Sequence, residues 1–159
     1  MIAIGARTAV IVPDAIAPRD LAVTFARYAL LDRGSYEHAA VDDPALIARL
    51  AQLARDATGR ALAVSEARLV RLVPGDYLLA HHDRVHEDFP IEVIADLSPA
   101  PVPGAEVHYR RRGQVFFRFP CTPGAASIVE RGPTVTCNHT YVSKLHAGAQ
   151  VVRLVALFR

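Results

Sequence analysis

The stretch ARLVRLVPGDYLLAHHDRVHEDFPIEVIADLS (67–98) contains three short apolar runs, separated by a Pro-Gly turn and by a charged segment. Short runs bounded by turn residues are typical of β-strands, whose side chains alternate between two faces. The stretch therefore predicts a strand, a turn, a second strand that carries the tripeptide His81-His82-Asp83, and then a third strand.

The same pattern continues to the end of the chain. Turn signals that contain glycine or proline separate five further runs: AEVHYR (105–110), QVFFRF (114–119), ASIVE (126–130), TVTCNHTYV (134–142) and QVVRLVALF (150–158). About eight short strands at close spacing predict an antiparallel sandwich or barrel.

The first part of the chain instead predicts helices. Pro18 fits the start of a first helix, because apolar residues follow it at helical spacing as far as Ala29. A second helix is predicted with Asp43 as its N-terminal cap, Pro44 at its first position and Gly59 at its end. We expect a mainly β protein with N-terminal helices packed on one outer face of the strands.

The length of 159 residues fits one domain. We expect residues 1–66 to give helical support, with a loop at 34–42 between the two helices, and residues 67–159 to form the β core. The hydrophobic content of 52% favours a compact fold, and a net charge of +2 gives no indication of a nucleic acid or membrane partner.

The location predicted from the chain is cytoplasmic. Its first residues lack the charged start and continuous apolar core of a signal peptide, and no apolar run reaches the roughly 18 residues of a membrane span. Cys121 and Cys137 lack the close spacing of metal ligands and are interpreted as two reduced thiols rather than a disulfide.

The tripeptide His81-His82-Asp83 has the spacing of a metal site. On a strand, His81 and Asp83 point to one face and His82 to the other. An imidazole and a carboxylate on one face can bind one metal ion, and a distant histidine would complete a 2-His-1-carboxylate triad of the type found in non-haem Fe(II) oxygenases. His139 is the candidate third ligand, and Arg153 is a candidate cation for an acidic cosubstrate.

The order of these motifs resembles a known family. The pieces are GDYLLAHHD, IEVIADLS, PGAEVHY, PCTPG, CNHTYV and GAQVVRLVALF, preceded by IVPDAIAPRDL near the amino terminus. Together they resemble the Fe(II)/2-oxoglutarate-dependent oxygenases, in the branch that includes the prolyl hydroxylases. The resemblance implies a double-stranded β-helix core, which is the jelly-roll fold also found in cupins.

The resemblance also implies a site and a reaction. His81, Asp83 and His139 match the iron ligands, and Arg153 matches the residue that pairs with the far carboxylate of 2-oxoglutarate. Tyr77 shares a strand face with His81 and Asp83 and is a candidate for contact with the cosubstrate. The implied activity uses Fe(II), 2-oxoglutarate and O2 to hydroxylate a substrate, with release of succinate and CO2.

The expected substrate is an amino acid, another small molecule or a residue of a peptide. The short chain leaves room for an open site or for one completed in a homo-oligomer. The alternative is a metal-binding β-barrel without 2-oxoglutarate oxygenase activity. Val155 and the long interval between His139 and Arg153 depart from the family pattern and favour this alternative.

Other histidines and arginines offer competing interpretations. His82 and His86 would share a face if their segment were helical, and His146 is a second candidate for the distal ligand. His108 is interpreted as a paired or solvated residue. The run Arg110-Arg111-Arg112, with Arg118, indicates either a solvated hairpin or a site for an acidic substrate.

Overall fold

The computed structural model describes residues 8–30, 34–80 and 83–159, and this part of the chain forms one helix and eleven strands. In chain order these are β1 (Ala9–Val12), β2 (Ala26–Leu30), β3 (Gly34–Ala39), α1 (Pro44–Thr58), β4 (Val64–Leu72), β5 (Tyr77–Leu78), β6 (Ile91–Asp96), β7 (Glu106–Arg111), β8 (Gln114–Pro120), β9 (Ala126–Glu130), β10 (Val135–His139) and β11 (Val151–Phe158).

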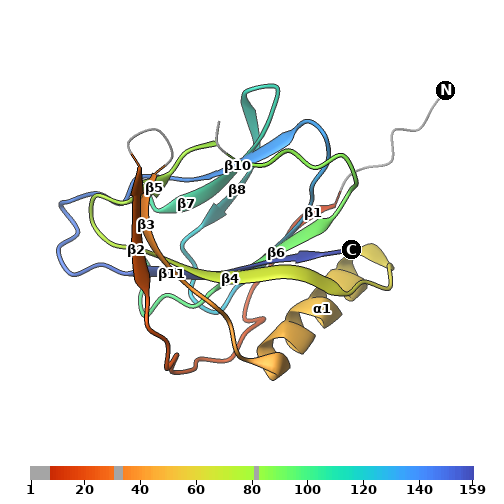
Figure 1. Ribbon diagram of the computed structural model, residues 1–159, viewed down its shortest axis with the longest axis horizontal. Coiled ribbons are helices and arrows are strands. Elements are labelled where there is room, and N and C mark those ends of the chain that lie inside the picture. The colour runs from red at the N-terminus through yellow and green to blue at the C-terminus, as the bar shows by residue number, and fades with distance from the viewer. Residues whose placement is uncertain (1–7, 31–33, 81–82) are drawn as a thin grey trace.

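Strands β4 to β11 are paired in a nested antiparallel order. β4 pairs with β11, β5 with β10, β6 with β9 and β7 with β8. The strands are divided between two sides of the molecule, with the neighbour order β9-β6-β11-β4 on one side and β5-β10-β7-β8 on the other. Figure 1 shows these two layers, which β3 joins at one edge by pairing with both β4 and β5. This arrangement is a jelly-roll, so the predicted double-stranded β-helix core is confirmed.

The second predicted helix is confirmed as α1. The Asp43 carboxylate accepts a hydrogen bond from the backbone N–H of Leu46 at 3.0 Å, and Pro44 occupies the first turn. Gly59 ends the helix in the left-handed conformation, with φ of 71°, and its N–H donates to the carbonyl of Arg55. The helix therefore begins and ends at the residues that the sequence predicts.

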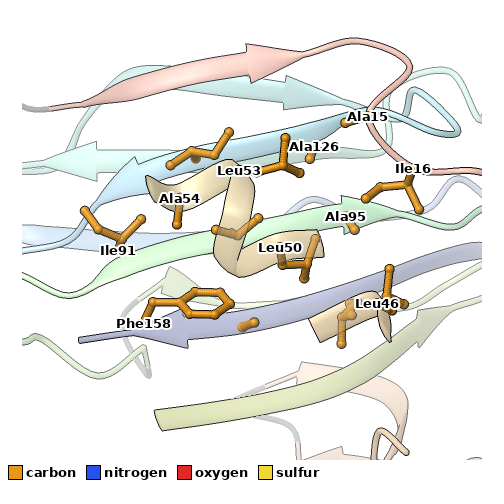
Figure 2. Packing of buried hydrophobic residues seen from close by; sticks show 14 of the residues in the cluster. Ala15, Ile16, Leu46, Leu50, Leu53, Ala54, Ile91, Ala95, Ala126 and Phe158 are labelled. Atoms are coloured by element: carbon orange, nitrogen blue, oxygen red, sulfur yellow. The ribbon is translucent and has the colours of Figure 1, made fainter. Parts of the chain in front are cut away.

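The helix covers the outer face of the sheet that contains β9, β6 and β11. Leu46, Leu50, Leu53 and Ala54 form its buried face. Figure 2 shows these side chains lying over apolar residues of the strands, among them Ile91, Ala126 and Phe158. Burial of this face anchors α1 on the sheet and closes the outer core.

A second core fills the space between the two layers of strands. Val107, Tyr109, Phe119, Val135 and Cys137 belong to it, and all are buried. Strand β11 contributes side chains to both cores, because its side chains alternate between its two faces. Leu154, Ala156 and Phe158 belong to the outer core, whereas Val151 and Val155 belong to the inner one.

The predicted first helix is wrong. Residues 17–25 have no regular structure, and Ala26–Leu30 forms β2, which pairs with β3. The predicted loop at 34–42 therefore contains a strand over Gly34–Ala39. Tyr28 lies opposite Tyr36, with ring centroids 5.1 Å apart, and this cross-strand contact favours the hairpin over the helix. The first part of the chain is thus strand β1, a hairpin and a helix.

The eight predicted strands are all present. The second is much shorter than expected, because only Tyr77 and Leu78 of the run DYLLAHHD form ladder contacts among the described residues. The two cysteines are free, as predicted. Over the described ranges, no helix has the length and hydrophobicity needed to cross a membrane.

Candidate functional site

The two layers of strands bring His139 and Arg153 together inside the barrel. His139 ends β10, where it lies opposite Leu78 and Val107, and Arg153 lies near the start of β11, between Val70 and Asp96. The guanidinium Nη1 of Arg153 donates a hydrogen bond to Nδ1 of His139 at 3.0 Å. Both residues are buried, so the contact crosses an interior that holds no bulk water.

Burial and charge set the protonation state of His139. Burial lowers the pKa of His139 well below its usual value, and the nearby charges of Arg153, Arg68 and Arg131 lower it further. His139 is therefore neutral, which is the form that a histidine needs in order to bind a metal ion. A neutral imidazole has one acceptor nitrogen, and in His139 that nitrogen already accepts from Arg153.

Arg153 is held at several points but keeps one unpaired donor. Its Nη2 donates to the backbone carbonyl of Ala105 at 3.0 Å, and its Nε is buried without a hydrogen-bond partner among the described residues. Burial lowers the pKa of Arg153, while the nearby Asp96 opposes this change. A buried N–H without an acceptor is costly, and a carboxylate placed here would satisfy it.

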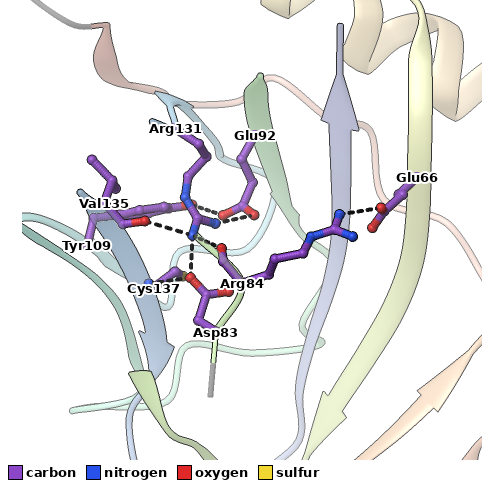
Figure 3. Close-up of polar contacts among 8 residues, drawn as sticks. All are labelled: Glu66, Asp83, Arg84, Glu92, Tyr109, Arg131, Val135 and Cys137. Carbon is purple, nitrogen blue, oxygen red and sulfur yellow. Dashed lines mark hydrogen bonds and ion pairs between the residues drawn. The ribbon is translucent and has the colours of Figure 1, made fainter. Parts of the chain in front are cut away.

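Asp83 lies beside β10 and is held there by two donors on one oxygen (Figure 3). Its Oδ2 accepts hydrogen bonds from Arg131 Nη2 and from the backbone N–H of Cys137, the latter at 2.7 Å. Its Oδ1 forms no hydrogen bond with the residues that the structure describes. Burial raises the pKa of Asp83 to about 6, although the charge of Arg131 acts in the opposite direction.

Arg131 is itself fixed by a buried network. The residue follows β9, is 1% exposed, and donates from Nη1 to Glu92 Oε2 at 2.9 Å. The other oxygen of Glu92 accepts from the hydroxyl of Tyr109 at 2.5 Å, and Arg131 Nη2 also donates to the carbonyl of Val135 at 3.1 Å. Figure 3 shows this network leading from the barrel core to Asp83.

A cavity of about 420 Å³ opens beside Asp83 and Arg131. Its polar lining comprises Glu66, Arg68, Asp83, Arg84, His86, Glu92 and Arg131, and its apolar lining comprises Tyr28, Tyr36, Ala67, Leu78, Leu79, Val155 and Leu157. The cavity reaches Asp83, whereas His139 and Arg153 lie in the barrel interior and do not line it. Its size is within the usual range for a small-molecule site.

The remaining predicted site residues are the ligand His81 and the tyrosine Tyr77. His81 and His82 lie outside the described residues, so the predicted role of His81 remains a prediction. Tyr77 is half-buried on β5 opposite Ser35, and its neighbour Leu78 lines the cavity instead. The structure therefore brings His139 and Arg153 together and places Asp83 by β10, but it does not place Tyr77 in the cavity wall.

Among the described residues, which leave out His81, no three His, Cys, Asp or Glu side chains are grouped closely enough to hold a metal ion. His86 is buried and lines the cavity, in a segment where the described residues form no α-helix. His108 pairs with Glu106 at 2.9 Å, as expected for a paired residue, and His146 lies in a turn after β10. Arg118 is exposed beside the same Glu106.

Sequence reasoning missed Arg131, Glu92 and Arg68. Glu92 lies within the apolar run IEVIAD, and a carboxylate in a fully buried strand needs a partner, so this position could have been noticed. Arg131 follows β9 in the turn before Gly132-Pro133, where its sequence neighbours give no indication of burial. Arg68 lies two residues before the buried Val70 on β4, which the alternation of the strand could have indicated.

The fold is shared with solved structures of a prolyl-4-hydroxylase, an α-ketoglutarate-dependent epimerase and a 2OG-Fe(II) oxygenase family member. A prolyl-4-hydroxylase from Pseudomonas putida is 13% identical, covers 97% of this chain and 93% of its own, and has a TM-score of 0.62. The non-haem α-ketoglutarate-dependent epimerase SnoN from nogalamycin biosynthesis is 12% identical, with coverage of 94% and 77% and a TM-score of 0.64. A 2OG-Fe(II) oxygenase family member from Burkholderia pseudomallei is 12% identical, with coverage of 86% and 73% and a TM-score of 0.61.

These likenesses establish a common fold. The predicted resemblance to the Fe(II)/2-oxoglutarate oxygenases, with a prolyl hydroxylase among the similar structures, is confirmed at that level. No protein-family profile matches the chain, and no curated protein sequence matches it. Because identities of 12–13% do not carry an activity from one protein to another, the function has to be argued from the site.

Proposed function

We propose that this protein is an Fe(II)- and 2-oxoglutarate-dependent oxygenase that hydroxylates a small molecule, an amino acid or a peptidyl residue. One observation carries the proposal: His139 and Arg153, from opposite layers of the barrel, meet at 3.0 Å inside it, and Asp83 is fixed beside the same strand β10. Strand pairing thus supports a site with one candidate ligand, His139, beside a buried cation, and Asp83 is hydrogen-bonded to the backbone of Cys137 on the same strand.

The available donor atoms fit a divalent metal ion. Asp83 uses only Oδ2 for its contacts with Arg131 and Cys137, which leaves Oδ1 as a free ligand atom among the described residues. Metal-binding carboxylates are commonly held by such hydrogen bonds on the other oxygen. His139 is neutral, and His81 would be the third ligand. The unpaired Nε of Arg153 fits a carboxylate of 2-oxoglutarate.

The residues of this chain would bind and orient the reactants, whereas iron, 2-oxoglutarate and O2 would supply the oxidation chemistry that side chains lack. Arg131, fixed by Glu92, holds the carboxylate of Asp83 in one orientation. The inner core of Tyr109, Phe119 and Val135 keeps water away from the buried end of the site. A dry interior strengthens the pairing of Arg153 with a carboxylate.

The contact between Arg153 and His139 would couple metal binding to cosubstrate binding. The acceptor nitrogen of His139 cannot accept from Arg153 and bind a metal ion at once, and the other tautomer would place an N–H against the guanidinium. Use of His139 as a ligand therefore requires Arg153 to leave it. Arg153 would then have donors free for the far carboxylate of 2-oxoglutarate, so the two binding events should favour each other.

The test is anaerobic titration with Fe(II) and 2-oxoglutarate, followed by visible absorption. We expect a metal-to-ligand charge-transfer band in the wild type, its loss in His81→Ala and His139→Ala, and weaker 2-oxoglutarate binding in Arg153→Ala. Arg118→Ala is the control, because Arg118 is exposed on β8, away from the barrel interior. Release of succinate with a panel of amino acids and peptides would then identify the substrate.

The second candidate function is a metal-binding β-barrel without 2-oxoglutarate oxygenase activity. Arginines already pair with two of the expected ligands, Arg131 with Asp83 and Arg153 with His139, and this observation favours the alternative. Binding of Fe(II) with no spectral response to 2-oxoglutarate would support it and contradict the proposal. Failure to bind a divalent metal would contradict both functions.

A further inference from the structure

The cavity beside Asp83 has charges that are almost all paired. At its floor, Arg131 contacts both Asp83 and Glu92, so this group of three carries one net negative charge when both carboxyls are ionised. At its rim, Arg84 pairs with Glu66, and both side chains are more than half exposed. A divalent cation bound at Asp83 would compensate the negative floor, and the rim pair needs no further partner.

Arg68 is the remaining charged group of the cavity lining. It forms no hydrogen bond or ion pair with any residue in the described ranges. Strand alternation places Arg68 on the same face of β4 as Val70, which is fully buried in the inner core, and its partner on β11 is Val155 of the cavity wall. Arg68 lines the cavity and is exposed to solvent.

Apolar groups form the rest of the lining. Tyr28 and Tyr36 stand 5.1 Å apart, and Leu78, Val155 and Leu157 complete the surface. Apolar and aromatic walls with one uncommitted charged group are typical of a small-molecule site, in which the apolar surface binds the body of the ligand and the charge fixes its direction. A guanidinium suits a carboxylate, because its planar N–H groups match the two oxygens.

We propose that the cavity binds a small carboxylic acid with an aromatic or aliphatic body, and that Arg68 binds its carboxylate. This inference rests on the proposed function for one step only, the assignment of the acid as the substrate. The apolar body would lie between Arg68 and the Asp83 end of the cavity, which places a carbon of the substrate near the candidate metal ligand.

The experiment compares two probes that differ in charge but scarcely in size, 4-phenylbutanoate and 4-phenylbutanamide. Calorimetric titration of metal-free protein should give about tenfold or tighter binding of the acid, which is a difference of about 1.4 kcal/mol. Arg68→Met should bind the two probes equally, and Arg68→Lys should keep part of the preference because it keeps the charge. Arg118→Met removes an equivalent charge outside the cavity and should bind like the wild type.

Three results would overturn the proposal. They are equal affinity of the wild type for acid and amide, no binding of the acid by the wild type, and an unchanged preference in both Arg68 variants. If Arg68→Met instead weakens anaerobic 2-oxoglutarate binding and leaves the probe unaffected, Arg68 serves the cosubstrate and the substrate assignment is wrong. The probe titration needs no metal, so its failure is distinguishable from failure of the oxygenase proposal.

Discussion

Two opposing effects, burial and the charge of Arg131, set the pKa of Asp83. Burial raises the pKa of its carboxyl to about 6 from an ordinary value of 3.8, and Arg131 opposes this change. A carboxyl with a raised pKa binds its proton more tightly in the folded state, so its contribution to stability is largest below about pH 4 and declines as the pH rises through 6. Each pKa unit corresponds to about 1.4 kcal/mol.

Asp83→Asn should therefore remove part of the pH dependence of folding in metal-free protein. We expect the free energy of unfolding of the variant, relative to the wild type, to increase between pH 4.5 and 7.5. Urea unfolding at several pH values measures this difference. A difference that stays constant, or that decreases over this interval, would mean that burial does not raise the pKa of Asp83.

Removal of Arg131 should reduce the free energy of unfolding more than removal of any other single polar residue of the barrel. Arg131→Met leaves Glu92 and Asp83 without their shared cation, and loss of one partner from a buried ion pair costs about 3–5 kcal/mol. Tyr109→Phe removes only the hydrogen bond to Glu92 and should cost about 1–3 kcal/mol. Urea unfolding near neutral pH compares the two variants, and equal losses would contradict the central position of Arg131 in the network.

At the scale of single residues, the sequence predicts those groups whose spacing has a chemical reason. His139 and Arg153 were expected in one site, and they meet inside the barrel. Arg131 was not expected, because its burial depends on Glu92 and Asp83, which are 39 and 48 residues away in the chain. A local sequence pattern does not indicate which residue so far away in the chain will be the partner.

The strands were predicted well because each is a short apolar run with a turn signal at its ends. The helix α1 was predicted for the same reason, since Asp43, Pro44 and Gly59 mark its limits. The error fell between residues 18 and 39. Apolar residues at helical spacing there belong to an irregular segment and a hairpin, and pairing of β2 with β3 decides the structure. Tertiary pairing of this kind overrides local propensity.

A glycine at the joint between β3 and β5 offers a test at the scale of elements. A Cβ on Gly34 would lie 2.5 Å from the backbone carbonyl oxygen of Tyr77, whereas a Cβ on Gly59 would meet nothing within 4 Å. Gly59→Ala should cost about 1–2 kcal/mol for its left-handed backbone alone. Gly34→Ala should cost more, because it forces β5 away from β3.

The same pair of variants also tests the cavity, since Leu78 of β5 lines it. Gly34→Ala should weaken binding of 4-phenylbutanoate, and Gly59→Ala, which lies at the end of α1, should not. Thermal unfolding and calorimetric titration give the two measurements. If Gly34→Ala were no more destabilising than Gly59→Ala, the close approach of β3 to β5 would be wrong.

For the whole molecule, the jelly-roll order explains how distant residues form one site. Pairing places β5 beside β10, and the contact between His139 and Arg153 joins β10 to β11 across the interior, although these strands span residues 77 to 158. The sequence could predict the eight strands β4 to β11 and their order along the chain, but it did not predict the hairpin of β2 and β3. Only the family resemblance could predict which layer each strand occupies, because hydrophobic periodicity does not indicate which strands pair.

The two cores share β11, and this predicts that they unfold together. Leu50→Ala removes a fully buried side chain from the outer core and should cost about 2–5 kcal/mol. The chain has five tyrosines and no tryptophan, and Tyr36 and Tyr109 lie in the inner core, so tyrosine fluorescence reports the barrel interior while far-ultraviolet circular dichroism reports the whole backbone. Both probes should shift to the same lower urea midpoint, because an all-or-none transition gives coincident curves.

Gln52→Ala is the matched control, because Gln52 is exposed on α1 and its side chain forms hydrogen bonds with Asp56 and Arg55 of the same helix. Its midpoint should stay close to that of the wild type. If Leu50→Ala moved the circular dichroism curve and left the fluorescence curve in place, the helix layer and the barrel would be separate cooperative units. The alternating side chains of β11 make that outcome unexpected, since loss of the outer core exposes the strand that also carries Arg153 and Val155.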